Sequence, residues 1–173
     1  RCADRRFRAT FAAMASRRVN TRILIREGRV EDHAFVEDLG KRTMGDSVAG
    51  FRHYNNAMLE ASYDGLLDFV FKQPHVLFIA ERGGMRAGFV LMLDTMPDEV
   101  TRMPQAFIAY MAVEPSARRY GIGSRLLTAA EDEARRRGLP YMGLMVTEDN
   151  AAARALYESA GFLTERRLLC KPL

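Results

Sequence analysis

The sequence predicts a single α/β domain, and three observations support this fold class. The chain has 173 residues, the usual size of one domain and too few for two. Its shares of 48% hydrophobic and 28% charged residues are ordinary for a globular protein. From Arg22 onward, segments with the two-residue period of strands alternate with segments that have the 3.6-residue period of helices. The longest apolar run, Ala106–Val113, is too short to cross a membrane.

The first half of the domain is expected to combine one strand, two helices and a hairpin. Ile23 and Ile25 share one face of the strand, and the Gly83-Gly84 pair marks the hairpin turn. Asp46 or Ser47 is expected to cap the second helix. In chain order these elements are a strand at 22–26, helices at 31–43 and from 46 to about 66, and strands at 76–81 and 87–93.

The second half is typical of a strand–helix–strand unit, followed by one more helix and one more strand. Pro115 ends the first strand, and Gly138 and Pro140 end the following helix. Tyr141–Val146 is uniformly apolar, as in strands buried on both faces. In chain order we expect a strand at 105–113, a helix at 122–137, a strand at 141–146, a helix at 150–160 and a final strand at 162–171.

The positive charge of the chain is concentrated in residues 1–21, which we expect to be a flexible Arg-rich tail before a domain at 22–173. Residues 1–22 carry seven arginines and one aspartate, although the net charge of the whole chain is only +4. The body therefore has a slight acidic excess, which argues against a nucleic-acid partner. One interpretation of the tail is a leader upstream of a native start at Met14.

The cysteines and histidines give no metal or disulfide pattern. Cys2 and Cys170 lie near opposite ends of the chain, outside any CxxC spacing. His33, His53 and His75 are scattered without an HExxH motif. We therefore expect no metal site, and free thiols in a reducing cytoplasm.

The chemistry is predicted to lie in the turn that follows the strand at 105–113. A Gly-x-Gly sequence, Gly121 and Gly123, opens a helix after two arginines, Arg118 and Arg119. Glycines let backbone N–H groups approach a ligand, and a helix N-terminus attracts anions, so this turn suits a pyrophosphate. The alternative is a plain β–α turn with solvated arginines. A dinucleotide fingerprint would need Gly or Ala where Leu126 stands.

Two motifs together resemble the GCN5-related N-acetyltransferases (GNAT). The segment Arg118-x-x-Gly121-x-Gly123 resembles the acetyl-CoA signature of that family. The segment Asn150-x-x-Ala153-x-x-x-Tyr157-x-x-x-Gly161-Phe162 is similar to its second signature and is the more specific of the two. The resemblance covers essentially the whole of residues 22–173, and it implies a mixed central sheet with helices on both faces and a splayed pair of parallel strands.

The resemblance also implies where acetyl-CoA, the acyl donor, would bind. It would lie between the strands at 105–113 and 141–146, pairing with backbone groups of the first strand. Asn150 is either a helix N-cap or a hydrogen-bonding partner of the pantetheine arm. The implied acetyl-CoA contacts are Met111, Ala112, Val113, Arg118, Arg119, Tyr120, Gly121, Ile122, Gly123, Ser124, Asn150 and Ala153.

The implied reaction is direct attack of a primary amine on acetyl-CoA in a ternary complex, with Tyr157 as the catalytic acid. A phenol can protonate the departing thiolate; the alternative role for Tyr157 is a packed aromatic. The position where several members carry a basic Glu is Phe107 here. Glu114, or Asp94, Asp98 or Glu99 through water, are candidate bases, and an amine of low pKa would need none.

The acceptor is not identified by the sequence. Carboxylates near the first two helices would favour a cationic amine such as a polyamine, an aminoglycoside, or a peptide N-terminus or lysine. The alternative is a solvated helix face with the aromatic side chains packed inward. The residues in question are Phe51, Tyr54, Glu60, Tyr63, Asp64 and Asp68. A catalytically silent acyl-CoA-binding sensor or interaction module is the second functional hypothesis. The oligomeric state stays open, with a homodimer as the candidate that the resemblance implies.

Overall fold

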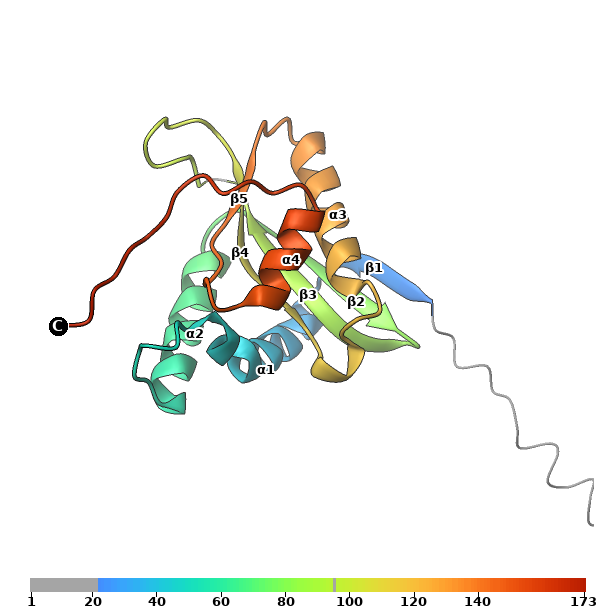
Figure 1. Ribbon diagram of the computed structural model, residues 1–173. Coiled ribbons are helices and arrows are strands. Elements are labelled where there is room, and N and C mark those ends of the chain that lie inside the picture. Colours follow the sequence, from blue (N-terminus) through green and yellow to red (C-terminus); the bar gives the residue numbers. More distant parts are fainter. Residues whose placement is uncertain (1–21, 95) are drawn as a thin grey trace, which may run out of the picture.

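Within residues 22–94 and 96–173, which the computed structural model describes, the chain forms a mixed five-stranded sheet flanked by four α-helices (Figure 1). The expected tail at 1–21 lies outside the described residues. The strands are β1 (Ile23–Glu27), β2 (His75–Arg82), β3 (Met85–Leu93), β4 (Ala106–Val113) and β5 (Met142–Leu144). The α-helices are α1 (His33–Thr43), α2 (Asn56–Phe71), α3 (Ile122–Arg136) and α4 (Ala151–Ser159), with 3-10 turns at η1 (Val30–Asp32), η2 (Met44–Ser47) and η3 (Pro115–Ala117).

The strands lie in the sheet in chain order, and only the last pair is parallel. β1 to β4 form an antiparallel meander, and β4 pairs with β5 in parallel. The β2–β3 hairpin turns on Gly83 and Gly84, both with positive φ, which explains the glycines of this turn. A parallel pair needs a crossover, and α3 supplies it between β4 and β5.

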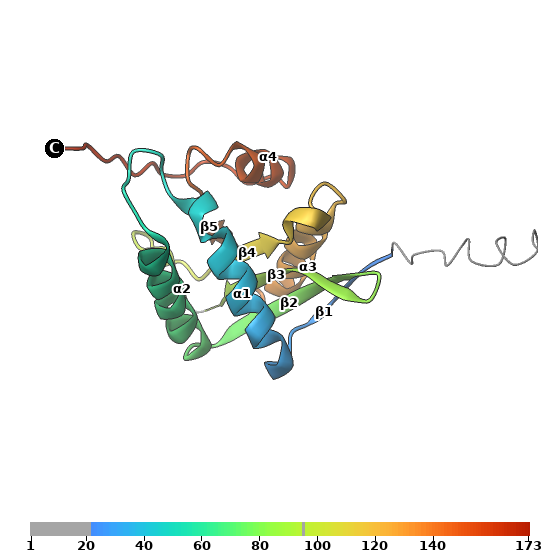
Figure 2. The same cartoon turned by 90° about the horizontal axis from the view of Figure 1, so that it is seen from below.

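Helices cover both faces of the sheet, which confirms the expected layers (Figures 1 and 2). α1 and α2 cover one face through a core that includes Val36, Leu39 and Tyr63. On the other face, α3 buries Ile122 and Leu126 against the sheet, and residues of α4 pack at the margin of the same core. None of the described helices has the length and hydropathy needed to span a membrane.

The second helix begins later than expected. Residues 44–47 form the 3-10 turn η2, a loop follows, and α2 starts only at Asn56. Asn55 caps α2, because its side-chain oxygen accepts a hydrogen bond from the N–H of Met58 at 2.9 Å. The prediction of a helix capped by Asp46 or Ser47 is therefore wrong. Residues 44–55 are instead a long connection, called the α1–α2 loop below.

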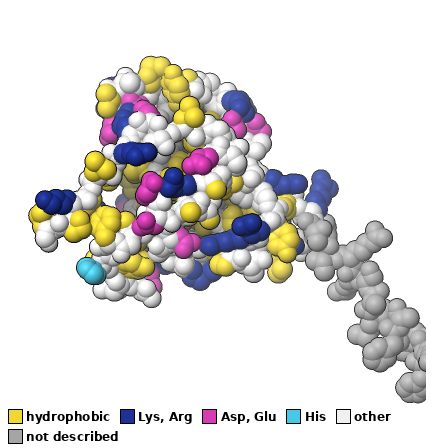
Figure 3. Space-filling model, in the orientation of Figure 1, with side chains coloured by type: hydrophobic (Ala, Val, Ile, Leu, Met, Phe, Trp, Pro, Cys, Tyr) yellow, Lys and Arg dark blue, Asp and Glu magenta, His cyan; other side chains and the backbone are white. Residues whose placement is uncertain are grey.

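The expected final strand at 162–171 is also wrong. β5 has three residues, shorter than expected, and the chain after Gly161 contains no strand. Leu163, Leu168 and Leu169 are 91%, 93% and 87% exposed. Figure 3 shows hydrophobic side chains at the left edge of the molecule, where this C-terminal segment ends. The segment has the apolar composition of a strand, but it does not pair with the sheet.

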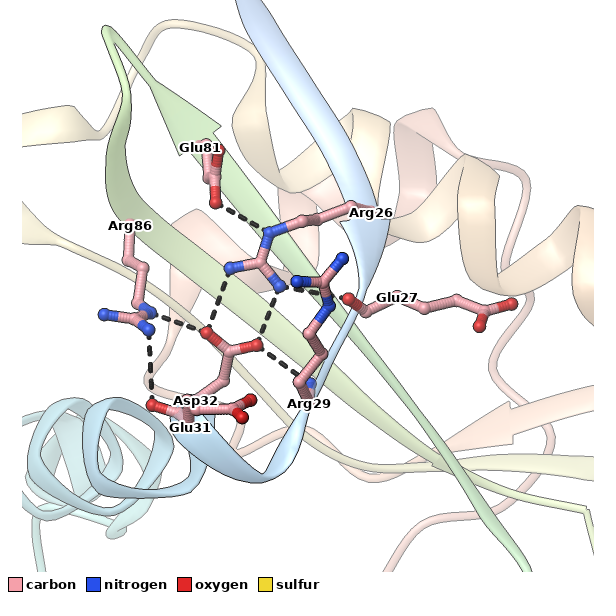
Figure 4. A network of polar contacts seen from close by, with 7 residues as sticks. All are labelled: Arg26, Glu27, Arg29, Glu31, Asp32, Glu81 and Arg86. Atoms are coloured by element: carbon pink, nitrogen blue, oxygen red, sulfur yellow. Dashed lines mark hydrogen bonds and ion pairs between the residues drawn. The ribbon is translucent and has the colours of Figure 1, made fainter.

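A buried carboxylate ties the first strand to the central hairpin (Figure 4). Asp32 is 1% exposed and accepts from Arg26 at 2.7 and 2.9 Å and from Arg86 Nε at 2.6 Å. Arg26 also donates to Glu81 on β2 at 2.6 Å. The hydrogen bond from Arg26, followed by those from Arg86 and the Arg29 N–H, holds the pKa of Asp32 far below its usual value despite burial.

Candidate functional site

The sheet opens between β4 and β5, which gives an edge where a ligand can bind. The parallel pairing covers Ala106–Ile108 and Met142–Leu144 only. The β3–β4 register shifts between Leu91 and Met92, so that Ala109 is an extra residue between the positions opposite them. From Tyr110 to Val113, β4 is paired with β3 but has no strand partner on its other side among the described residues. Free N–H and C=O groups at such an edge can pair with an extended ligand. Met111, Ala112 and Val113 lie on it.

The turn before α3 presents unpaired backbone N–H groups. Arg119 has φ 70° and Gly121 has φ 79°, and Gly121 is the N-cap of α3 without a side-chain cap. Among the described residues, the N–H groups from Arg119 through Ser124 donate no hydrogen bond to the backbone or to a side chain. A positive φ at a non-glycine residue is strained, and such strain is often retained at binding sites. Together with the helix dipole, these N–H groups make a site for an anion.

Packing fixes this turn on both sides. The guanidinium carbon of Arg82, from the β2–β3 hairpin, lies 3.5 Å from the centroid of the Tyr120 ring. Gly123 packs directly against α4, since a Cβ there would lie 2.8 Å from Leu156 Cδ2. The glycine at 123 therefore permits the close approach of α3 and α4, whereas the glycine at 121 supplies a left-handed conformation. Ile122 is buried in the core below the turn.

Arg118 and Asn150 are brought together by the α1–α2 loop. Arg118 donates from Nη2 to Asp46 Oδ2 at 3.0 Å and from Nε to Val113 O at 3.3 Å. Asn150 caps α4 by accepting from the N–H of Ala153 at 3.1 Å, and its Nδ2 donates to Asp46 O at 3.0 Å. The N-cap role expected as one of two alternatives for Asn150 is thus present.

Tyr157 lies on α4 with its ring edge-on to Phe162, 5.7 Å between centroids. It is half-buried, and its hydroxyl forms no hydrogen bond with any described residue. Burial raises the pKa of Tyr157, and the nearby Tyr110 raises it further. The hydroxyl therefore stays protonated at neutral pH and is available to donate. Tyr110, on β4, lies with its hydroxyl 3.3 Å from Thr43 Oγ1.

The four carboxylates that are candidate bases are each paired with an arginine. Glu114 accepts from Arg42 at 2.7 and 3.3 Å. Asp98 accepts from Thr101 and Arg166, which hold its pKa well below its usual range. Asp94 pairs with Arg137, and Glu99 with Arg166 at 3.0 Å. Because its pKa is lowered, the Asp98 carboxylate is a weak base, which argues against Asp98 as the general base.

Three of the residues expected on the acceptor side, Phe51, Tyr54 and Glu60, line surface grooves. A groove of about 480 Å³ is lined by Phe51 and Tyr54 of the α1–α2 loop, by the start of α2, and by Cys170 and Pro172. Glu60 lines a second groove of about 410 Å³ that shares Tyr54.

The other three expected acceptor-side residues do not line either of these two grooves. Tyr63 is fully buried and donates to Val36 O at 3.0 Å, as expected in the alternative in which the aromatic side chains of this region pack inward. Asp64 pairs with Lys41 at 2.7 Å, and Asp68 pairs with Lys72 at 2.6 Å on the surface.

Sequence patterns alone do not predict the contacts of two residues near the candidate site, Asp46 and Tyr110. Asp46 has the pattern of a helix cap, and Tyr110 that of one residue in an apolar strand. Asp46 contacts residues 72 and 104 positions further along the chain, a proximity for which the sequence has no local signal. Across the described part of the chain, no group of three or more His, Cys, Asp or Glu side chains is placed to hold a metal ion.

The comparison with family models identifies one family. Residues 43–162 match the model of the Acetyltransferase (GNAT) family. A putative acetyl transferase from Pyrococcus furiosus is 26% identical with a TM-score of 0.75, covering 88% of this chain and 100% of that one. A GCN5-related N-acetyltransferase from Ralstonia eutropha is 21% identical, with a TM-score of 0.68 and coverages of 88% and 99%.

A predicted acetyltransferase from Clostridium acetobutylicum, solved with acetyl-CoA, is 19% identical, with a TM-score of 0.60 and coverages of 87% and 96%. At these identities the last two likenesses concern the fold. No curated protein sequence matches the chain significantly.

Proposed function

The chain belongs to the acetyltransferase (GNAT) family, and on that premise we propose that it is an N-acetyltransferase using acetyl-CoA and a primary amine. The observation that carries this proposal is the open edge of β4 beside the turn of unpaired N–H groups at 119–124. An extended pantetheine arm suits the edge, and a pyrophosphate suits the turn. The structural neighbour from Clostridium acetobutylicum, which contains acetyl-CoA, supports the same donor.

The donor site that we propose follows the chain from strand to helix. Met111, Ala112 and Val113 offer backbone groups to the pantetheine arm along β4. The turn from Arg118 through Arg119, Tyr120, Gly121, Ile122 and Gly123 to Ser124 receives the pyrophosphate. Asn150 and Ala153 bound the arm at the start of α4.

The proposed reaction is direct transfer within a ternary complex. The amine nitrogen forms a bond to the acetyl carbonyl carbon, the carbon–sulfur bond breaks, and the sulfur leaves with the electron pair of that bond. Backbone N–H groups of β4 stabilise the negative charge that develops on the carbonyl oxygen. Tyr157 donates its proton to the departing sulfur. The amine nitrogen loses one proton to solvent, and the Tyr157 phenolate takes one proton from solvent, which restores the phenol.

A second candidate, a silent acyl-CoA-binding module, is favoured by one observation. Phe107 pairs with Gly143 at the position where the resemblance would place a basic Glu, and the alternative carboxylates are paired with arginines. A silent module would bind acetyl-CoA without transferring the acetyl group.

The two candidates separate in an acceptor screen. Acetyl-CoA is mixed with the protein and a panel containing a polyamine, an aminoglycoside, a free peptide N-terminus and a lysine peptide, and both acetylated product and free CoA are measured by mass spectrometry. The enzyme candidate predicts an acetylated amine in wild type and its loss in Tyr157→Phe. Tight binding of acetyl-CoA with no acetylated amine would favour the silent module.

We further propose a cytoplasmic homodimer. The exposed leucines of the C-terminal segment and the short edge strand β5 are both surfaces that a second copy would cover. The free, exposed Cys170 suits a reducing compartment. Sedimentation equilibrium should give twice the chain mass for wild type and the chain mass for a Leu168→Asp, Leu169→Asp variant. A monomeric wild type would contradict the dimer.

A further inference from the structure

The α1–α2 loop (residues 44–55) spans the opening between β4 and β5 and is bonded to both sides of it. On the side of β4, Arg118 Nη2 donates to Asp46 Oδ2 at 3.0 Å. On the side of β5, Thr147 Oγ1 donates to Ser47 O at 2.5 Å, and Asp149 Oδ2 accepts from the Gly50 N–H at 2.8 Å. The same loop carries Phe51 and Tyr54, which line the larger groove.

Asp46 is the residue of this loop that contacts both halves of the proposed donor site. Its carboxylate accepts from Arg118, and its carbonyl oxygen accepts from Asn150 Nδ2 at 3.0 Å. Arg119, which follows Arg118 in the sequence, has no such carboxylate partner among the described residues. Arg119 is exposed and has no hydrogen bond or ion pair to any described residue. One of the two cations at the phosphate turn is therefore already neutralised by a carboxylate of the chain itself.

The ion pair between Asp46 and Arg118 is weak enough for Arg118 to leave Asp46 and bind a ligand instead. The two side chains are 54% and 46% exposed, and ion pairs at such exposure contribute little to the stability of a fold. A pyrophosphate at the adjacent N–H groups would attract the guanidinium and repel the Asp46 carboxylate. Arg118 cannot keep its present geometry with Asp46 and also turn to an anion at the turn.

We propose that Asp46 is an internal competitor for Arg118, and that acetyl-CoA takes Arg118 from it and so loosens the end of the α1–α2 loop that is bonded on the side of β4. Asp46 thereby couples occupation of the donor site to the loop that carries Phe51 and Tyr54. It is a positioning residue that acts through Arg118 and touches neither substrate. The inference rests on the proposed function, since it assigns the regulation of the same site.

The test is a set of calorimetric titrations with acetyl-CoA. Asp46→Asn should bind acetyl-CoA about fivefold more tightly than wild type, because the competing exposed ion pair is lost. The matched control is Asp149→Asn, which removes the same charge and another tie of the same loop but has no contact with Arg118, and it should change the affinity for acetyl-CoA by much less than Asp46→Asn does. In an Arg118→Gln background, Asp46→Asn should tighten binding by much less than fivefold, because only the direct repulsion between Asp46 and the pyrophosphate is left to relieve.

Amide hydrogen exchange gives a second readout, a ligand-dependent change in residues 44–55, which a general loss of stability in the variant would not produce. Acetyl-CoA should speed exchange in the peptide covering residues 44–55 of wild type, whereas Asp46→Asn should exchange at the faster rate before ligand is added. Equal or weaker binding by Asp46→Asn, or slower exchange of the loop when wild type binds acetyl-CoA, would overturn the inference and leave the proposed function intact. If wild type itself does not bind acetyl-CoA, the proposed function fails as well.

Discussion

At the scale of single residues, the proposed chemistry depends on the hydroxyl of Tyr157. Replacing it by Phe removes the acid and keeps the ring that packs against Phe162. We expect kcat to fall by about a hundredfold or more, the usual contribution of a positioned acid, and the Kd for acetyl-CoA to stay within about twofold. Steady-state kinetics with the best amine of the screen, together with calorimetry, measures both.

The matched control for this substitution is Tyr141→Phe. Tyr141 is 58% exposed, and its backbone carbonyl, which accepts from the Ala106 N–H, is unaffected by the change. Its turnover should equal that of wild type. If Tyr157→Phe turned over as fast as Tyr141→Phe, the acid role would have to be given up.

The sequence can predict residues of the site when their function is local. Gly121 sets the backbone conformation of its own turn, and Asn150 is a cap that bonds three residues ahead. The close contact of Gly123 with Leu156 of α4 depends on the fold instead. Asp46 cannot be assigned in this way, because its partner Arg118 lies 72 residues away. The arginine partners of the candidate bases cannot be predicted for the same reason, since each carboxylate meets its arginine only through the fold.

At the scale of elements, the packing of α1 on α2 makes a sharp prediction from two glycines. A Cβ at Gly40 would overlap the ring of Tyr63, which is fully buried between the two helices and the sheet. A Cβ at Gly65, in α2, would meet nothing within 4 Å. Gly40→Ala should therefore lower the free energy of unfolding by about 3 kcal/mol through overpacking.

Gly65→Ala is the control with the same chemical change. In an exposed helical position, alanine should raise the free energy of unfolding by about 0.5–1 kcal/mol. Urea denaturation of the two variants and wild type gives both values. A Gly40→Ala protein as stable as Gly65→Ala would show that α1 and α2 are not packed as described.

Elements with local signals can be predicted well, and those that depend on a partner cannot. The β2–β3 hairpin has its glycines, and α3 has an apolar face bounded by Gly121 and Gly138. The start of α2 is expected too early because Asp46 resembles a cap, while the cap in use is Asn55. The segment at 162–171 has the composition of a strand, but a strand forms only where an edge accepts it.

At the scale of the whole molecule, the Asp32 cluster should set the acid stability of the fold. Contacts with Arg26 and Arg86 lower the pKa of Asp32 in the folded state. A lowered folded pKa stabilises the protein above the ordinary aspartate pKa of about 4, and that contribution is lost as pH falls below it. Asp32→Asn should be less stable than wild type by about 3 kcal/mol at pH 7, with the difference shrinking below about pH 4.

The control for this prediction is Asp68→Asn. Asp68 pairs with Lys72 on the surface of α2, with the two side chains 67% and 68% exposed. Removing it should cost no more than about 0.5 kcal/mol at any pH. Urea denaturation of the three proteins from pH 3 to pH 7 compares them, and a constant difference between wild type and Asp32→Asn across that range would contradict the assignment.

The central claim concerns the whole molecule: the open edge of β4 and the turn before α3 together form a site for acetyl-CoA. The most direct measurement is calorimetric titration of the wild-type chain with acetyl-CoA, with NADH as a control that shares the adenosine and pyrophosphate groups but lacks the pantetheine arm. The account predicts one acetyl-CoA bound per chain and no saturable binding of NADH. Absence of acetyl-CoA binding would mean that the turn and the split in the sheet are structural features only, and equal binding of NADH would remove the role given to the β4 edge.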